Sequence, residues 1–167
     1  NRDNLGVGDF NLEERAWSSD STTDTLRVRN TRTIGKKMFS ELKFEFNQST
    51  SKNNSFSQAP TLQVLDAFTG GGAGQAGTRE GRQFTVDQSL DFTIRKHALR
   101  AGLLFEAGTW DSTQQTNANG TYTFSSLADF QAGIARTYTR RAGDPTVSYS
   151  QYQAGWYIQD DFRLTKN

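Results

Sequence analysis

Cysteine is absent from this 167-residue chain, so disulfide bonds, thiol chemistry and cysteine-based zinc sites are excluded. Histidine occurs once, at His97, and its expected place in a tight turn makes it a poor candidate for a catalytic base held by an orienting group. No apolar run reaches the 18 residues of a transmembrane helix. A net charge of +1 argues against nucleic acid as a partner. We therefore expect no enzyme, no cofactor and no metal site.

Aliphatic residues are scarce for a water-soluble core. Only 34% of the residues are hydrophobic and mean hydropathy is −0.74, while phenylalanine occurs 12 times. This composition is typical of a β-barrel with a thin apolar belt, a wet lumen and polar loops.

The segment from Phe84 to Ala107 predicts a hairpin of two long strands that turns near Lys96-His97. Each strand alternates apolar and polar side chains, so the hairpin has one apolar and one polar face. Pairing Ile94 with Leu99 keeps the apolar residues together. Each arm is about ten residues long, as a tilted membrane-spanning strand requires. The apolar positions are Phe84, Val86, Leu90, Phe92, Ile94, Leu99, Ala101, Leu103, Phe105 and Ala107.

A second hairpin is predicted over 26–46, with its turn at 35–37 and Ile34 paired with Met38. This register places Arg27 opposite Glu45, a favourable pair, and Arg29 opposite Lys43, an unfavourable one. Water would screen the Arg29–Lys43 repulsion, whereas a dry core would not.

The remaining segments predict mostly loops. Residues 1–23, 47–58, 70–81 and 109–144 are polar or glycine-rich. Short strands are expected at 61–68 and around 122–124, a helical turn within 126–134, and a last long strand at 148–164. Long and short connections alternate, as in outer-membrane barrels.

Several smaller motifs have ordinary interpretations. The glycine-rich run 70–74 lacks the lysine of a phosphate-binding loop, so we interpret it as a flexible loop. His97 is expected in a turn. Asp160 and Asp161 are adjacent on a strand and point to opposite faces, which favours lumen or rim charges over a metal site. Period-two alternation alone is also compatible with a soluble β-sandwich.

Five segments together resemble the TonB-dependent outer-membrane receptors, in particular their Oar-like (carboxypeptidase-regulatory-like) subgroup. Their order and spacing match over nearly the whole chain, and the "Y-I-Q-D-D-W/F-R" strand and "K-H-x-L-R-x-G" hairpin are the clearest. The five segments are 4–10, 67–73, 96–102, 119–124 and 155–167.

The resemblance implies that residues 1–167 form part of one TonB-dependent receptor β-barrel domain. The expected fold class is all-β, an antiparallel transmembrane β-barrel segment with long extracellular loops. Because the chain begins at Asn1 and shows no signal peptide or plug domain, we expect a mid-barrel fragment, an incomplete barrel. Its expected place is the outer membrane of a Gram-negative bacterium.

The implied function is to form barrel wall and loops for uptake of an unidentified ligand. The expected partners are membrane lipid, that ligand, and the TonB complex through the missing plug. The predicted lumen-facing residues are Asp87, Asp91, Arg100 and Glu106. The predicted ligand-loop aromatics are Phe68, Trp110, Tyr122, Phe124 and Phe130. Two alternatives stay open: a non-transporting adhesion or surface-display barrel, and a soluble carbohydrate-binding β-sandwich.

Overall fold

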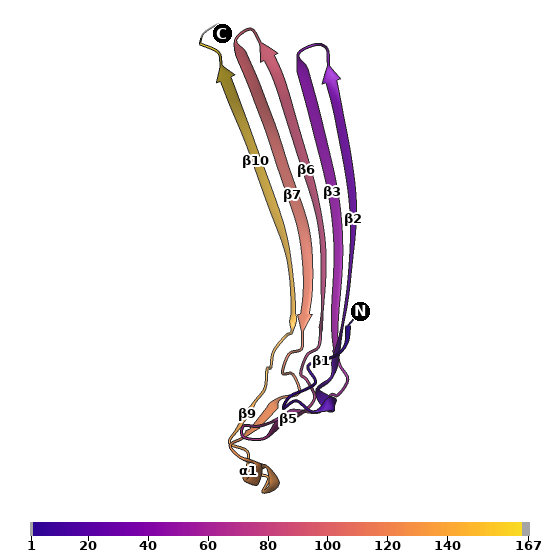
Figure 1. Ribbon diagram of the computed structural model, residues 1–167, viewed down its shortest axis with the longest axis vertical. Coiled ribbons are helices and arrows are strands. Elements are labelled where there is room, and N and C mark those ends of the chain that lie inside the picture. Colours follow the sequence, from indigo (N-terminus) through magenta and orange to yellow (C-terminus); the bar gives the residue numbers. More distant parts are fainter. Residues whose placement is uncertain (1, 165–167) are drawn as a thin grey trace. The chain divides into compact units, whose positions relative to one another are not determined.

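A computed structural model describes residues 2–164. The chain is all-β and its main sheet has six strands in the order β1-β2-β3-β6-β7-β10, an antiparallel meander. Figure 1 shows the long strands lying side by side. Within the described residues this sheet does not close on itself, which confirms the predicted fold class. The strands are β1 (Arg2–Leu5), β2 (Trp17–Ile34), β3 (Met38–Ser55), β6 (Gly77–Ile94), β7 (His97–Gln114) and β10 (Thr146–Phe162).

The four strands of the two hairpins are nearly twice as long as the sequence predicts, whereas β10 has the predicted length within a shift of two residues. Strands β2, β3, β6 and β7 have 18 residues each and β10 has 17. At about 3.3 Å per residue, 18 residues span about 60 Å. The predictions of loops over 47–58 and from 109 onward were therefore wrong in part, because β3 continues to Ser55 and β7 to Gln114.

Both predicted hairpins form, with one change of register. Strand β2 ends at Ile34 and β3 begins at Met38, as predicted. In the second hairpin the turn is only Arg95-Lys96, so Ile94 faces His97 rather than Leu99 across it. Arg95 has φ +56, in the left-handed region that so tight a turn requires. A shift of two residues leaves every side chain on its predicted face, because the side-chain period is two.

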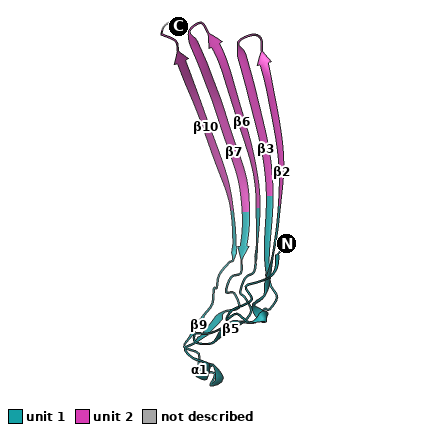
Figure 2. Cartoon of the chain, in the orientation of Figure 1, with its two compact units in different colours: residues 1–22, 49–80, 111–148 teal, residues 23–48, 81–110, 149–167 magenta. Residues whose placement is uncertain are grey.

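The chain divides into two compact units, coloured in Figure 2. Unit 2 contains the tight turns and the adjoining parts of the long strands: Thr23–Gln48, Gly81–Trp110 and Tyr149–Asn167. Unit 1 contains the other ends of these strands and the long connections: Asn1–Thr22, Ser49–Glu80 and Asp111–Ser148.

Unit 1 contains a second, four-stranded sheet in the order β5-β4-β8-β9. Strands β4 (Thr61–Val64) and β8 (Thr121–Phe124) pair in parallel, so that Val64 lies beside Phe124. Strands β5 (Phe68–Gly71) and β9 (Thr137–Thr139) flank them in antiparallel orientation. The helix α1 (Leu127–Gln131) begins after Ser126, whose Oγ accepts a hydrogen bond from the Asp129 backbone N–H. The predicted short strands and helical turn are thus present.

The glycine-rich run is only partly the loop that the sequence predicts, because Gly70 and Gly71 lie in β5 while residues 72–76 form no helix or strand. Gly71 lies in β5 with φ +72, and a Cβ there would come within 2.0 Å of the Pro60 carbonyl oxygen. The Glu14 carboxylate accepts a hydrogen bond from the Gly71 backbone N–H. Glycine is needed here because the backbones approach too closely for a side chain.

The N-terminal segment also has a structural role. It contains β1 and a 3-10 turn, η1 (Glu13–Arg15). The Arg15 guanidinium donates to the Gly72 carbonyl oxygen (2.9 Å) and to Thr61 Oγ1 (3.3 Å). Partial burial lowers the pKa of Arg15 from its usual value. The prediction of an irregular segment over 1–23 was therefore wrong in part, because β1, η1 and the first residues of β2 lie within it.

Candidate functional site: the two faces of the long strands

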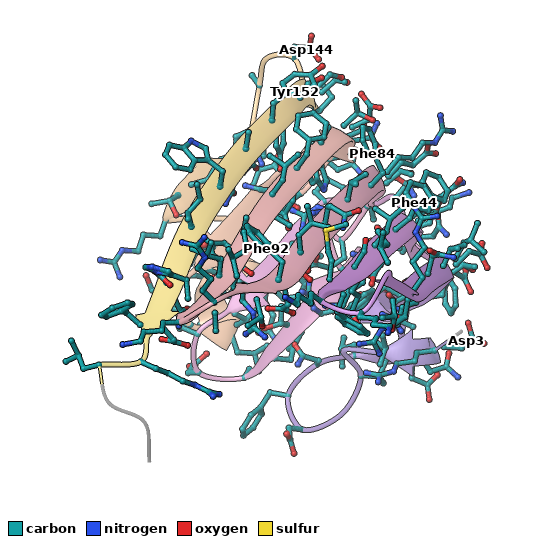
Figure 3. The ribbon with its side chains drawn as sticks, turned by 90° about the horizontal axis from the view of Figure 1, so that it is seen from above. Asp3, Phe44, Phe84, Phe92, Asp144 and Tyr152 are labelled. Atoms are coloured by element: carbon teal, nitrogen blue, oxygen red, sulfur yellow. The ribbon has the colours of Figure 1, made fainter. Side chains whose placement is uncertain are left out.

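One face of the sheet in unit 2 is a belt of apolar side chains, as the alternation predicts. Many of these side chains are exposed: Trp156 is 79% exposed, Tyr152 72% and Ile158 70%. Phe44, Phe84, Phe92 and Tyr152, from strands β3, β6 and β10, are labelled in Figure 3. An exposed apolar surface this extensive needs an apolar partner. The apolar belt comprises Leu26, Val28, Ile34, Met38, Leu42, Phe44, Phe46, Phe84, Val86, Leu90, Phe92, Ile94, Leu99, Ala101, Leu103, Phe105, Ala107, Tyr152, Ala154, Trp156 and Ile158.

The height of the apolar belt matches a lipid bilayer. On β6 it runs over the eleven residues Phe84–Ile94. At about 3.3 Å per residue and a tilt of about 40°, this stretch covers about 25 Å along the membrane normal. That is the height of the lipid-facing band of outer-membrane barrels.

Two polar side chains on the belt face bond to each other. The Gln88 Nε2 donor lies 3.1 Å from Ser40 Oγ and 3.1 Å from the Glu41 carbonyl oxygen. A polar group in hydrocarbon costs free energy unless it is hydrogen-bonded. Gln88 and Ser40 are therefore compatible with an apolar environment.

The opposite face carries ion pairs across neighbouring strands. Arg27 Nε lies 2.8 Å from Glu45 Oε2, so the predicted cross-strand pair is present. On the hairpin of β6 and β7, Arg100 pairs with Asp91. These side chains are partly exposed, and ionised groups in this number require water.

The predicted repulsion between Arg29 and Lys43 is resolved by a third residue. Glu41 pairs with Arg29 and lies 2.8 Å from Lys43 Nζ. Lys43 also lies 3.4 Å from Asp87 Oδ2 on β6. The four side chains form a charge ladder over β2, β3 and β6. Directly opposed residues alone do not reveal the role of Glu41, because it contacts Arg29 diagonally across the strands and Lys43 along its own strand.

All four predicted lumen-facing residues lie on the face of this ladder. Asp87 bonds to Lys43 and Asp91 to Arg100. Glu106 helps to line a small hollow of about 80 Å³ with Trp110 and other residues of β6, β7 and β10. The structure thus brings the four onto one polar face, and their contact with a lumen stays a prediction.

The predicted ligand-loop aromatics are distributed differently. Phe130 packs edge-on against Phe68 (centroids 5.3 Å) and Phe124 (5.2 Å), and Phe124 is only 6% exposed. These three rings form one aromatic cluster in unit 1, in which Phe124 is buried and Phe68 and Phe130 are partly exposed. Tyr122 packs on Tyr138 at 4.5 Å. Their contact with a ligand stays a prediction.

Trp110 lies in strand β7 rather than in a loop, which corrects its predicted location. It stacks on Tyr149 of β10 with centroids 5.2 Å apart and an interplanar angle of 15°. The prediction ended the strand too early because Thr109 and the residues after Trp110 are polar.

The only histidine has a partner that the sequence did not reveal. His97 is the first residue of β7, and its Nδ1 lies 2.6 Å from Asp160 Oδ2. Its ring packs on Phe162 at 4.8 Å. Asp161, pointing the other way as predicted, lines a hollow of about 440 Å³ that also includes Lys36 and Arg100.

The model of one protein family, the outer membrane beta barrel domain, matches residues 6–167. The chain therefore belongs to the outer membrane beta barrel domain family. No curated protein and no solved structure matches it. Among the described residues, no helix has the length and apolar character to cross a membrane.

Family membership agrees with the character of the apolar belt. It places the chain in the outer membrane of Gram-negative bacteria. The soluble β-sandwich alternative is thereby rejected. In such barrels the tight turns face the periplasm and the long connections face outward. Unit 1 accordingly belongs to the extracellular connections.

Proposed function

We propose that this chain forms part of the wall of a TonB-dependent transporter and that unit 1 contributes to capture of its ligand outside the cell. The observation that carries the proposal is the pairing of a bilayer-high apolar belt with a charge ladder on the opposite face. Partly exposed ion pairs over β2, β3, β6 and β7 need a wet or polar interior. A wide transport barrel, with water and a plug inside, provides one.

The strand lengths add support. About 9–11 residues of each strand suffice to cross the membrane, yet the long strands have 17 or 18. The remaining residues lead into unit 1, which has its own sheet and an aromatic cluster of Phe68, Phe124 and Phe130. The resemblance of 96–102 and 155–167 to TonB-dependent receptors adds the transport class. The proposal assigns no catalytic step to this chain.

The test uses the complete protein that contains this chain, purified in detergent. We expect it to bind the isolated periplasmic domain of TonB saturably in surface plasmon resonance. A variant that lacks the segment before the barrel is the matched control and should lose this binding. Equal binding by both proteins, or no binding by either, would contradict the transport proposal.

A non-transporting surface-display barrel is the second candidate. The separate sheet and aromatic cluster of unit 1 favour it, because a folded extracellular subdomain also suits adhesion. Cells that express the complete protein would then attach to a surface or partner without any dependence on TonB. Loss of attachment in a tonB deletion strain would speak against display.

A further inference from the structure

We propose that a polar hollow in unit 1 binds a hydroxyl-rich carboxylate, an acidic sugar, through Arg140 and Arg141. The hollow has a volume of about 380 Å³ and lies where β7 ends and β10 begins. It is lined by Gln114, Gln115, Thr116, Ala118, Asn119, Arg140, Arg141, Ala142, Gly143, Asp144 and Pro145.

The charge of the lining favours an anion. The lining contains two arginines, Arg140 and Arg141, and one acidic residue, Asp144. Asp144 Oδ1 already accepts a hydrogen bond from the Thr146 backbone N–H (2.9 Å). Guanidinium groups bind carboxylates through two parallel hydrogen bonds, which gives both affinity and orientation.

Arg140 is held in place by the chain itself. Its Nε donates to the Ala118 carbonyl oxygen at 2.9 Å, which leaves the two terminal nitrogens of the guanidinium for a ligand. The Arg141 backbone N–H donates to the Asn117 carbonyl oxygen at 3.1 Å. Holding a side chain before the ligand arrives lowers the entropy cost of binding.

Asn117 organises this side of the hollow. Its φ of +58 is uncommon for a residue other than glycine. Its Oδ1 accepts from Thr121 Oγ1 (2.9 Å), and its Nδ2 lies 3.4 Å from the Thr139 carbonyl oxygen. Asparagine tolerates this conformation, and its hydrogen bonds hold the two chain segments of the hollow together.

The rest of the lining suits hydroxyl groups. Gln114, Gln115, Thr116 and Asn119 provide amides and a hydroxyl that donate and accept hydrogen bonds. No aromatic ring lines this hollow within the described residues, so a neutral sugar has no stacking surface there. Charge recognition must then supply most of the affinity.

A second polar hollow extends the site. It has a volume of about 310 Å³ and shares Gln114 and Thr116 with the first. Its lining adds Arg79 together with Ser51 and Asn53. Two adjoining hollows with arginine in each fit a ligand of at least two acidic sugar units.

The role in uptake rests on the proposed function, but the binding itself does not. The probe is digalacturonate, and the matched neutral probe is α-1,4-galactobiose, both titrated calorimetrically into the complete barrel. We expect saturable binding of digalacturonate alone. The R140Q/R141Q double variant should bind roughly 10- to 100-fold more weakly, as the loss of charge-assisted hydrogen bonds implies. Arg140→Lys, which keeps the charge but loses the fork, should give an intermediate loss.

Arg136→Gln is the control, because Arg136 lies in the same connection but lines neither hollow. It should bind digalacturonate as the parent does. Three results would overturn the proposal: no saturable binding by the parent, equal binding of galactobiose, or equal losses in R136Q and R140Q/R141Q. Failure of TonB binding with intact digalacturonate binding would overturn only the transport role.

Discussion

Replacing Leu90 by arginine tests whether lipid covers the apolar belt. Leu90 is four residues from Ile94, where the belt ends on β6. At about 2.5 Å of depth per tilted residue, its Cα lies about 10 Å inside that boundary, near the bilayer centre. A lipid-facing arginine at this depth costs about 2–4 kcal/mol of unfolding free energy. Phe92 lies about 5 Å inside the boundary by the same reckoning, so Phe92→Arg should cost less.

Ser89→Arg is the matched control. Ser89 neighbours Leu90 on the same strand but faces the side that carries Asp87 and Asp91. An arginine there meets water and two carboxylates, so we expect little change. Asp91→Arg would be a poorer control, because Asp91 already pairs with Arg100.

The measurement is denaturant unfolding of the complete barrel in phospholipid vesicles, followed by tryptophan fluorescence. We expect a graded loss of unfolding free energy, largest for Leu90→Arg, smaller for Phe92→Arg and near zero for Ser89→Arg. Equal losses at positions 89 and 90 would refute the assignment of the two faces. Equal losses at 90 and 92 would refute the depth scale.

Three further predictions concern single contacts. Gly71→Ala should destabilise unit 1 by more than about 1–2 kcal/mol, because the left-handed backbone and the Pro60 carbonyl both exclude a Cβ. Limited proteolysis should then cleave the variant faster than the parent protein. Phe124→Ala should lower the unfolding free energy by about 3–5 kcal/mol, because it opens a cavity beside α1. Earlier protease cleavage after the strand β8 would show this loss. Arg27→Glu should lower the thermal unfolding temperature, and adding Glu45→Arg should restore it; a double variant no better than the single one would show that the pair contributes nothing.

The sequence predicts the part of the fold in which the two faces of a strand differ. Between Phe84 and Ala107 apolar and polar residues alternate except around Leu104, and this pattern together with the similar one over 26–46 predicts both hairpins. The hairpin at Gly35 also has its predicted register, confirmed by the Arg27–Glu45 pair. At Arg95-Lys96 the register was wrong by two residues, because alternation fixes the parity of a pairing but not the length of the turn.

The candidate site was harder to predict than the wall. The odd or even position of a residue along its strand is enough to assign it to the lumen side. The residues with which it forms ion pairs cannot be assigned in this way. Glu41 reaches Arg29 and Lys43 along and across strands, and His97 meets Asp160 from a distant segment. No sequence pattern marks Arg140 and Arg141 as site residues, because the fold assembles their hollow from two separate segments, 114–119 and 140–145.

The mismatch between pattern and strand length has a physical cause. In a barrel wall, alternation marks the stretch in which one face of a strand is apolar and the other polar, so its extent over Phe84–Ile94 gives the height of the apolar belt. Backbone pairing has no such limit, since the ladder of hydrogen bonds continues wherever two strands stay adjacent. Outside the membrane both faces of β3 and β7 meet water, and serine, threonine and asparagine replace the alternation without ending the strands. A sequence of this family therefore marks where the membrane ends, and the strands continue beyond it toward the connections that carry the arginine-lined hollow.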